Sequence, residues 1–221
     1  MDYRGRRAMS GTPTPRQQQR ERTRERVLEA SLEVMAERGV AGLVLSEVAS
    51  RVGLRQPSLY AYVASREALY DELFRRGMEQ HAGTVRAALG DGAPGLAAVR
   101  RAMVATVRFA VEQPVLAQLL FQRVVPGFTP SAEAYAPSLE VAALVGGAVQ
   151  EAVRRGELHR DAASRRGVDL LVALTAGVAT LQVTNDPGSG FDEGRFAPLV
   201  HDALDLWQQR YGPRGGSTAP R

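Results

Sequence analysis

Residues 44–73 decide the fold of this chain, and they read VLSEVASRVGLRQPSLYAYVASREALYDEL. Two short segments with apolar residues at helical spacing lie on either side of Gly53. The residues expected on their inner faces are Val48, Ala49, Val52, Leu59 and Val63. Gly53 can adopt the left-handed conformation that ends a helix, and Pro57 suits the first turn of the next one. The stretch therefore predicts a helix, a tight turn and a second helix.

The outer surface of the second predicted helix carries almost no charge. If Leu59 and Val63 point inward, the residues left outside are Gln56, Ser58, Ala61 and Tyr62, with Tyr60 at the margin. Amide, hydroxyl and phenol groups reach base edges and phosphate oxygens without bulk. Further along, Ser65 is expected to cap the next helix, which places Arg66 near a phosphate. The alternative is an ordinary solvent-exposed helix pair within an all-helical core.

This stretch resembles the DNA-binding domain of TetR-family transcriptional regulators. The likeness extends back through residues 16–38 and covers about the first third of the chain. It is carried by Ala49, Gly53, Gln56, Pro57, Ser58, Leu59, Tyr60, Val63, Ser65, Arg66, Glu67 and Leu69. We expect base readout by Gln56, Pro57 and Ser58 with Arg55 nearby, and contacts to the DNA backbone from Tyr60, Tyr62, Arg66 and Ser46.

One departure from the family lies at the start of the first helix of the motif. The family usually has Thr or Ser, which caps this helix and often contacts a phosphate, where this chain has Val44. Two outcomes are open at this position. Either Ser46 caps the helix one turn later, or the helix start is weaker.

The composition indicates a globular protein without cysteine chemistry. Hydrophobic residues make up 44% of the 221 residues, and the absence of Cys excludes disulfides and thiol chemistry. The net charge of +4 is modest, but residues 1–26 hold eight Arg against Asp2, Glu21 and Glu25, a local net charge of +5. Residues 1–15 are predicted to be a disordered basic arm, which either follows the DNA backbone or minor groove or is passive.

No export signal or membrane span is expected from the sequence. Residues 1–7 are charged and are not followed by an apolar run, unlike a signal peptide. The longest apolar stretch, residues 170–183, is shorter than the roughly 20 residues that a membrane-spanning helix requires. We therefore expect a cytoplasmic protein.

The whole chain is predicted to be all-α, with about nine helices in two domains. Residues 16–75 are expected to form a three-helix DNA-binding domain, and residues 76–211 a larger helical domain for effector binding and dimerisation, before a flexible tail at 212–221. Besides the helix-turn-helix, the predicted helices cover residues 16–38, 66–89, 96–113, 114–123, 138–155, 161–185 and 192–211, with a Pro-rich loop at 124–137. The helix at 66–89 joins the two domains, so a small tilt would move the reading helix.

Aromatic and apolar residues in the second domain are candidates for a ligand pocket. Those expected to line it are Met103, Phe109, Leu116, Leu120, Phe121, Phe128 and Tyr135, with polar contacts from Arg108, Glu112, Gln122, Arg123 and His159. The alternative is that the aromatic side chains simply fill the core. The resemblance favours a pocket, because ligand binding in the helical domain of the family releases DNA.

The last two predicted helices are candidates for a dimer interface. The residues expected there are Ala173, Ala176, Gly177, Thr180, Phe196, Val200, Leu204 and Trp207. Pairing with twofold-related mates would form a four-helix bundle. A dimer would place two reading helices about 34–36 Å apart, which implies a pseudo-palindromic DNA site. The alternative buries both faces within one subunit.

The sequence shows little sign of enzyme chemistry. The histidines, His81, His159 and His201, lack the spacing of a zinc site, and there is no glycine-rich phosphate loop. Residues 188–190, Gly-Ser-Gly, read as a turn and not as a nucleophile elbow. We expect no enzyme activity, no metal and no cofactor.

The sequence thus predicts a ligand-responsive, sequence-specific DNA-binding regulator. We expect a repressor that a small, largely hydrophobic effector releases from its operator. The first alternative is a DNA-binding regulator that responds to no ligand and has a fully packed second domain. The second is a small helical enzyme or carrier.

Overall fold

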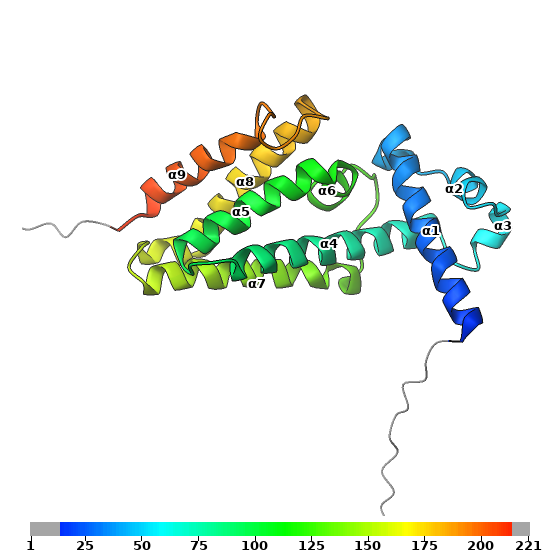
Figure 1. Cartoon of the computed structure of the whole chain (residues 1–221), viewed down its shortest axis with the longest axis horizontal. Coiled ribbons are helices and arrows are strands. Elements are labelled where there is room, and N and C mark those ends of the chain that lie inside the picture. Colours follow the sequence, from blue (N-terminus) through cyan, green and yellow to red (C-terminus); the bar gives the residue numbers. More distant parts are fainter. Residues whose placement is uncertain (1–13, 214–221) are drawn as a thin grey trace, which may run out of the picture.

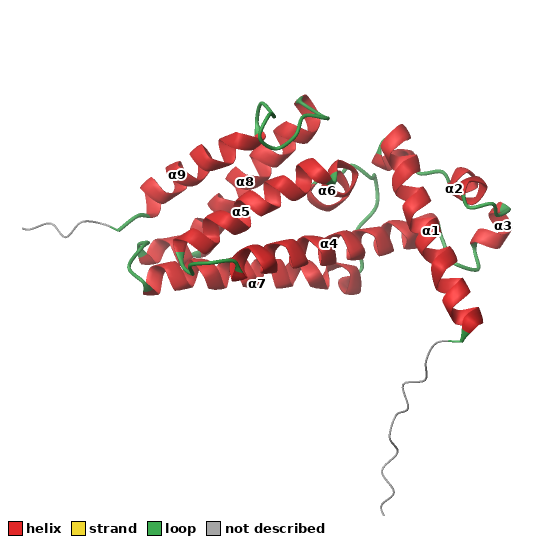
Figure 2. Cartoon of the chain, viewed as in Figure 1, coloured by secondary structure: helices red, strands yellow, loops and turns green. Residues whose placement is uncertain are grey.

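Helices form all the regular secondary structure in residues 14–213, which are the residues that this computed structural model describes (Figure 2). Nine α-helices and three short 3₁₀ helices occur in this range, so the all-α fold expected from the sequence is confirmed. The α-helices are α1 (Pro15–Arg38), α2 (Leu45–Arg51), α3 (Gln56–Leu59), α4 (Arg66–Gly90), α5 (Leu96–Glu112), α6 (Pro114–Phe121), α7 (Ala132–Arg154), α8 (Arg165–Asn185) and α9 (Val200–Tyr211). The expected arm at 1–15 and tail at 212–221 lie almost wholly outside the described residues.

Helices α1, α2 and α3 lie together at one end of the molecule, and α1 crosses the N-terminal part of α4 (Figure 1). A capping box begins α1: Thr14 Oγ1 accepts the Gln17 N–H (3.3 Å), and Gln17 Oε1 accepts the Thr14 N–H (2.8 Å). Such a cap pairs amide groups that have no partner within the helix, and it contributes about 1 kcal/mol. Helices α2 and α3 lie at the tip of the molecule, away from α5 to α9 (Figure 1).

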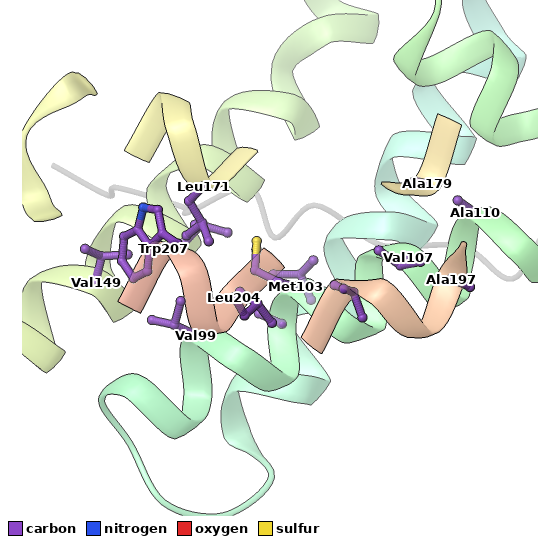
Figure 3. Close-up of a cluster of buried hydrophobic side chains, with 14 of the residues drawn as sticks. Val99, Met103, Val107, Ala110, Val149, Leu171, Ala179, Ala197, Leu204 and Trp207 are labelled. Carbon is purple, nitrogen blue, oxygen red and sulfur yellow. The ribbon is translucent and has the colours of Figure 1, made fainter. Parts of the chain in front are cut away.

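Two hydrophobic cores meet along α4. The first buries side chains from α1, α2, α3 and the first half of α4, together with Leu119 of α6 and Ala134 of α7. The second buries side chains from the end of α4 and from α5, α7, α8 and α9, including Met103, Leu171 and Trp207 (Figure 3). Because Met78 belongs to the first core and Val85 to the second, α4 is a structural part of both.

Helix α7 begins earlier than the sequence predicts. It starts at Ala132, so Pro137 lies inside the helix and the expected loop at 124–137 is shorter. Ser131 caps the helix, and Asp71 of α4 fixes Ser131 by accepting its N–H and its hydroxyl proton, each at 2.7 Å. Pro137 loses only one helical hydrogen bond at this position. A tertiary contact between residues 60 positions apart thus decides where the helix starts.

The last two helices begin later than expected. A 3₁₀ helix (Arg160–Ala163) replaces the predicted start of the helix at 161–185, and Ser164 caps α8 by accepting the Gly167 N–H (3.2 Å). Residues 192–196 form turns, so α9 starts only at Val200. Buried Gln182 holds these turns, because its Oε1 accepts the N–H groups of Phe196 and Ala197, each at 2.9 Å.

Three residues expected at a dimer interface lie inside the subunit instead. Val200, Leu204 and Trp207 belong to the second core, which corrects the prediction that α9 presents them outward (Figure 3). The Trp207 Nε1–H donates to the Gly167 carbonyl oxygen (2.8 Å). A Cβ on Gly167 would lie 2.4 Å from the Ala162 carbonyl oxygen, so only glycine permits this approach.

Helix α8 is the one helix of the described residues that is long and apolar enough, at 21 residues, to cross a membrane. A single such helix is weak evidence for a span, because core helices have the same composition. Leu171, Ala179 and Val183 of α8 are buried in the second core. Packing thus accounts for one face of α8, whereas Leu170, Val172 and Leu181 leave apolar surface exposed on another.

Candidate nucleic-acid interface

The turn between α2 and α3 has the geometry that its sequence predicts. Gly53 has a φ of 73°, which lies in the left-handed region that favours glycine. The Gly53 N–H donates to the Ser50 carbonyl (3.1 Å), and the Leu54 N–H donates to the Ala49 carbonyl (2.8 Å). These two bonds satisfy carbonyl groups at the end of α2 and turn the chain sharply toward α3.

Helix α3 is short but firmly anchored. It ends at Leu59, and turns continue to Val63, whose N–H donates to the Leu59 carbonyl (3.1 Å). Leu59 is completely buried and Val63 nearly so, as the sequence predicts. Burial of a leucine side chain stabilises the fold by about 2 kcal/mol, so this contact fixes the position of α3.

The side chains expected to contact DNA are mostly exposed around α3. Arg55, Gln56, Pro57 and Ser58 are exposed, Tyr60 is 49% exposed, and Tyr62 is half-buried. We call these six residues the α3 surface. Arg66 is exposed at the start of α4, where Ser65 Oγ caps the helix by accepting the Ala68 N–H (3.1 Å).

Ser46 does not cap α2. The N-cap position is Val44, which has no side-chain hydrogen bond, and Ser46 is the second residue of the helix and is exposed. Of the two outcomes open at this position, the structure thus has the weaker helix start. The Ser46 hydroxyl therefore takes no part in capping, and it is accessible to a binding partner.

Most arginines behind the α3 surface are engaged within the protein. Arg20 donates to the Ala61 carbonyl (3.1 Å), and Arg26 donates to the Val52 carbonyl (3.2 Å). These two hydrogen bonds connect α1 to the segments that follow α3 and α2. Arg51 pairs with Glu33 (3.2 Å) and also with Glu37. Arg55 has no ion pair among the described residues. It is therefore the cation of the α3 surface that is open to phosphate or base edges.

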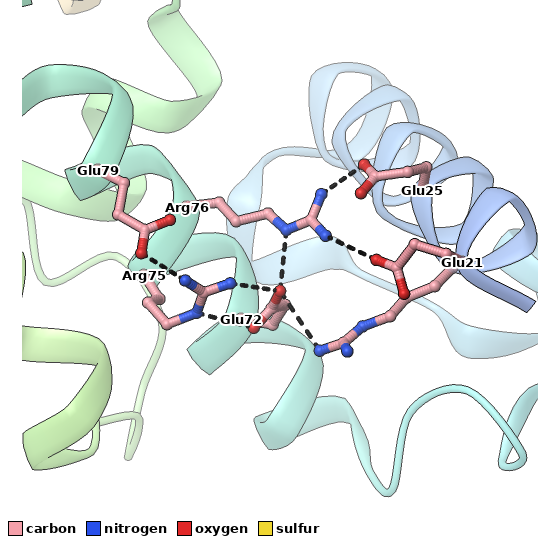
Figure 4. Close-up of polar contacts among 7 residues, drawn as sticks. Glu21, Glu25, Glu72, Arg75, Arg76 and Glu79 are labelled. Atoms are coloured by element: carbon pink, nitrogen blue, oxygen red, sulfur yellow. Dashed lines mark hydrogen bonds and ion pairs between the residues drawn. The ribbon is translucent and has the colours of Figure 1, made fainter. Parts of the chain in front are cut away.

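An ion-pair network holds α1 to α4 behind this surface (Figure 4). Glu72 Oε1 accepts from Arg75 and Arg76, each at 2.8 Å, and lies 3.4 Å from Arg24 of α1. Arg76 also pairs with Glu25 of α1. Burial alone would raise the pKa of Glu72, but the hydrogen bonds from Arg75 and Arg76 hold it below its usual value. The network fixes the angle between the helix-turn-helix and α4.

A cavity of about 370 Å³ lies between α4, α5, α6, α7 and α8, and we call it the central cavity. Of the residues expected in a pocket, Met103, Leu120, Phe121 and Tyr135 line it. Phe128 lines an adjoining cavity of about 290 Å³ instead, together with Gln122 and Arg123. Further wall residues, which the apolar pattern of the sequence does not indicate, are Phe74, Met78, His81, Thr106, Ser138, Val141, Val145, Val172 and Thr175.

The other residues expected in the pocket lie elsewhere. Phe109 and Leu116 are buried and do not line either cavity. Arg108 and Glu112 line a separate hollow beside residues 186–191. His159 is the N-cap of the 3₁₀ helix at Arg160–Ala163, where its Nδ1 accepts the Asp161 N–H (3.3 Å). These positions depend on which way each helix face turns, which apolar content alone does not determine.

Helices α8 and α9 also leave apolar side chains exposed. On α8, these fall at helical spacing: Leu170, Ala173, Gly177 and Leu181 are exposed. On α9 and just before it, Leu206 is 61% exposed and Leu199 is 47% exposed. Two expected interface residues, Ala173 and Gly177, therefore lie on an open face, whereas Ala176 and Thr180 are half-buried. Phe196 is also half-buried.

Comparisons with known proteins agree with this architecture. Residues 27–73 match the family model of bacterial regulatory proteins, tetR family. Over 57 residues the chain is 37% identical to the tetracycline repressor protein class D of Escherichia coli, a segment that spans 26% of each protein. The likeness to this curated relative thus covers about a quarter of its length.

Two of the solved structures that resemble this chain are matched over most of their own length. One is a candidate regulatory protein, SCO4313, with 26% identity, a TM-score of 0.70 and coverage of 88% of this chain and 98% of that one. The other is the transcriptional regulator FadR from Bacillus subtilis in complex with stearoyl-CoA, with 18% identity, a TM-score of 0.62 and coverage of 83% and 96%. Residues 27–73 of this chain therefore match the tetR family, and the chain as a whole shares its fold with these solved structures.

Proposed function

We propose that this protein is a DNA-binding transcriptional regulator, in the mode of a repressor, that a small and largely hydrophobic effector releases from a pseudo-palindromic operator. The observation that carries the proposal is the α3 surface, where uncharged polar groups and Arg55, which has no ion pair within residues 14–213, face solvent on a helix-turn-helix. Such a helix enters the major groove of DNA. A regulator of this kind works in the cytoplasm and needs no catalytic residues, and the matched family is one of regulatory proteins.

The residues of this surface divide into two roles. Gln56, Pro57 and Ser58, with Arg55 beside them, read bases, and Pro57 does so only through apolar contact with a group such as a thymine methyl. Contacts to the DNA backbone come from Tyr60, Tyr62, Arg66 and Ser46, and these supply position and salt-dependent affinity. Both sets are exposed or half-buried at the tip of the molecule.

Dimerisation is part of the proposal, because one short helix reads too few base pairs. The exposed face of α8 and α9 supports it, with Leu170, Leu181 and Leu206 around the small residues Ala173 and Gly177. A Cβ on Gly177 would meet no atom of the subunit within 4 Å, so the surface there is open to a partner. Twofold pairing of this face makes an isologous interface.

Release of DNA follows from the position of α4. Phe74, Met78 and His81 of this helix line the central cavity, while its first turn carries Arg66. Tyr70 of the same helix ties it to the short 3₁₀ helix Val40–Gly42 that precedes α2, because the Tyr70 hydroxyl donates to the Val40 carbonyl (2.7 Å). An effector in the cavity favours an α4 tilt at which the two α3 helices of a dimer no longer match the operator spacing.

Selection of bound duplexes from a random pool tests the division of roles. Replacing Gln56 or Ser58 with Ala is expected to change the preferred bases at defined positions, at a cost of about 1–3 kcal/mol in discrimination per lost contact. Replacing Arg66 with Ala is expected to weaken all duplexes alike. The same pattern of loss for all three variants would refute the roles, and no affinity of the wild type for any duplex would refute the regulator.

The ligand-independent alternative has less support, because the second domain contains a cavity of about 370 Å³, within the ~300–1,000 Å³ range of small-molecule sites. The enzyme or carrier alternative would be supported if the protein turned over a substrate, or bound a cargo molecule, and had no affinity for any DNA duplex. The same duplex selection separates it from the proposal.

A further inference from the structure

His81 is a buried imidazole in the wall of the central cavity. It lies on α4, is 3% exposed, and packs against the rings of Phe109 and Phe121 at centroid distances of 5.2 Å each. Its Nε2 lies 3.1 Å from Thr106 Oγ1. The Thr106 hydroxyl gives its single proton to the Ala102 carbonyl (3.0 Å), so Oγ1 accepts from His81. This pairing favours the tautomer of the neutral ring that carries its proton on Nε2.

The other nitrogen of this ring has no partner in the part of the chain that the structure describes. His81 Nδ1 is buried and makes no hydrogen bond with the described residues. Desolvation lowers the pKa of His81 to about 4, so the ring is neutral at physiological pH and Nδ1 remains a bare acceptor. A buried acceptor without a partner costs free energy, and a donor supplied by a bound molecule would remove that cost.

Ser138 presents a second polar atom without a partner in the same cavity. Its Oγ is buried and makes no hydrogen bond with the described residues. Other helical hydroxyls in this protein donate to the carbonyl four residues earlier, as Ser31 does to Val27 (2.6 Å) and Thr175 to Leu171 (2.9 Å). Ser138 makes no such bond among the described residues, so its hydroxyl is left without the partner that these other hydroxyls have.

The charge of the cavity wall restricts what can bind there. No arginine is among the residues that line the central cavity, and the chain has no lysine, whereas Asp169 is in the wall. The adjoining cavity has Arg123, which is exposed. The rest of the central cavity is mostly apolar, with Phe74, Met103 and Val145 in its wall. A carboxylate or phosphate placed beside His81 would have no cation to compensate its desolvation.

We propose that the effector is a neutral, largely apolar molecule whose hydroxyl or N–H group donates a hydrogen bond to His81 Nδ1, with Ser138 Oγ as its second polar partner. This rests on the proposed function, in which the central cavity is the effector site. His81 then determines specificity, because an analogue without the donor leaves Nδ1 unpaired. Sites that hydrogen-bond a ligand reject analogues that lack the matching group.

Calorimetric titration of the full chain with three matched probe series tests the inference. The series are 4-alkylphenols, which donate, 4-alkylanisoles, which have the same shape without the donor, and 4-alkylbenzoates, which are anionic, each graded in chain length. We expect the phenols to bind about tenfold more tightly than the anisoles, and the benzoates to bind most weakly. In His81→Leu the preference for phenols disappears while anisole affinity is kept. Ser138→Ala reduces the preference in part.

Thr84→Ala is the matched control, because it removes a hydroxyl from the same helix at a position that does not line the central cavity. It is expected to keep the preference for phenols. The ¹⁵N resonance of His81 Nδ1 gives a second readout in the unmutated protein, which is independent of whether His81→Leu folds. That resonance is expected to shift toward the hydrogen-bonded range on saturation with a phenol.

The outcomes separate the inference from the proposed function. Equal binding of phenols and anisoles, or an unchanged Nδ1 resonance at saturation, would overturn the role of His81 and leave the cavity as an effector site. Absence of binding by every series would overturn both the inference and the effector site, while the duplex selection still decides whether the protein binds DNA. Tightest binding by the benzoates would overturn the neutral effector.

Discussion

The α3 surface and the central cavity differ in where their polar groups lie. At the α3 surface, Gln56, Ser58 and Arg55 face solvent, and one buried leucine fixes their position. In the cavity, His81 Nδ1 and Ser138 Oγ are buried among apolar side chains and have no partner in the described part of the chain. The first arrangement suits a charged, hydrated partner, and the second suits a neutral molecule that loses its water. Each region can therefore be perturbed without the other.

The largest difference between the effect on DNA binding and the effect on the central cavity is expected from Leu59→Ala. Leu59 is completely buried in the first core, and truncation of such a side chain costs about 2–5 kcal/mol of unfolding free energy. DNA affinity should be lost, while phenol binding in the central cavity is retained. Hydrogen exchange resolved by residue is the measurement. Equal loss of protection in α8 and α9 would show that the two cores unfold as one unit.

Acid is expected to destabilise the cavity region through His81. Its pKa is about 4 in the folded chain, against an ordinary value of 6.5, so the unfolded chain binds the proton first as pH falls. The stability from the neutral ring is complete above about pH 6.5 and is lost toward pH 4, by up to about 3 kcal/mol. Urea unfolding of the wild type and His81→Leu across this range measures the difference.

The comparison with His81→Leu isolates this histidine. The carboxylates, including Asp169 in the same cavity, are common to both proteins, so their effect cancels in the difference. Parallel pH profiles for the two proteins would contradict the buried neutral state of His81.

Arg55→Ala is expected to affect only the α3 surface. Arg55 is exposed and has no ion pair among the described residues, so its loss should cost DNA affinity of about 1–2 kcal/mol at low salt and no stability. If Arg55 contacts a phosphate, the slope of log K against log salt falls by about one unit; if it contacts a base, the slope is kept and one position loses preference. Arg51→Ala is the contrasting variant, because Arg51 is paired with Glu33 and Glu37.

The smallest effect is expected at the joint between the two regions. Asp71→Asn weakens the two hydrogen bonds that Asp71 of α4 accepts from Ser131, at a cost of about 1 kcal/mol in unfolding free energy. We expect a reduced change in DNA affinity when a phenol binds, with both separate affinities nearly kept. Unchanged coupling between the two ligands would exclude Asp71 from the connection.

Features that depend on neighbouring residues were predictable from the sequence. The turn at Gly53, the burial of Leu59 and Val63, and the cap at Ser65 each follow from residues a few positions apart. Features set by distant contacts were not. The start of α7 depends on Asp71, and the inward position of Trp207 depends on a close approach to Gly167. A pattern of apolar residues shows that a helix is buried, but it does not show against which neighbour.

The central cavity shows the same limit. Met103, Leu120, Phe121 and Tyr135, which the sequence predicts in a ligand pocket, line this cavity; their role in ligand binding stays a prediction. From the sequence, His81 is considered only as a candidate metal ligand and is set aside. The significance of His81 comes from Thr106, 25 residues away, which favours the proton on one nitrogen and leaves the other bare. No local pattern in the sequence records that arrangement.

Helix α4 runs without interruption from Arg66, beside the α3 surface, to the wall that holds His81. If an effector lowers operator affinity by tilting α4, thermodynamic linkage requires that the operator lower effector affinity by the same factor. A cell rich in operator copies would then need more effector to reach half-response. The threshold of the switch would depend on gene dosage as well as on the chemistry of the cavity.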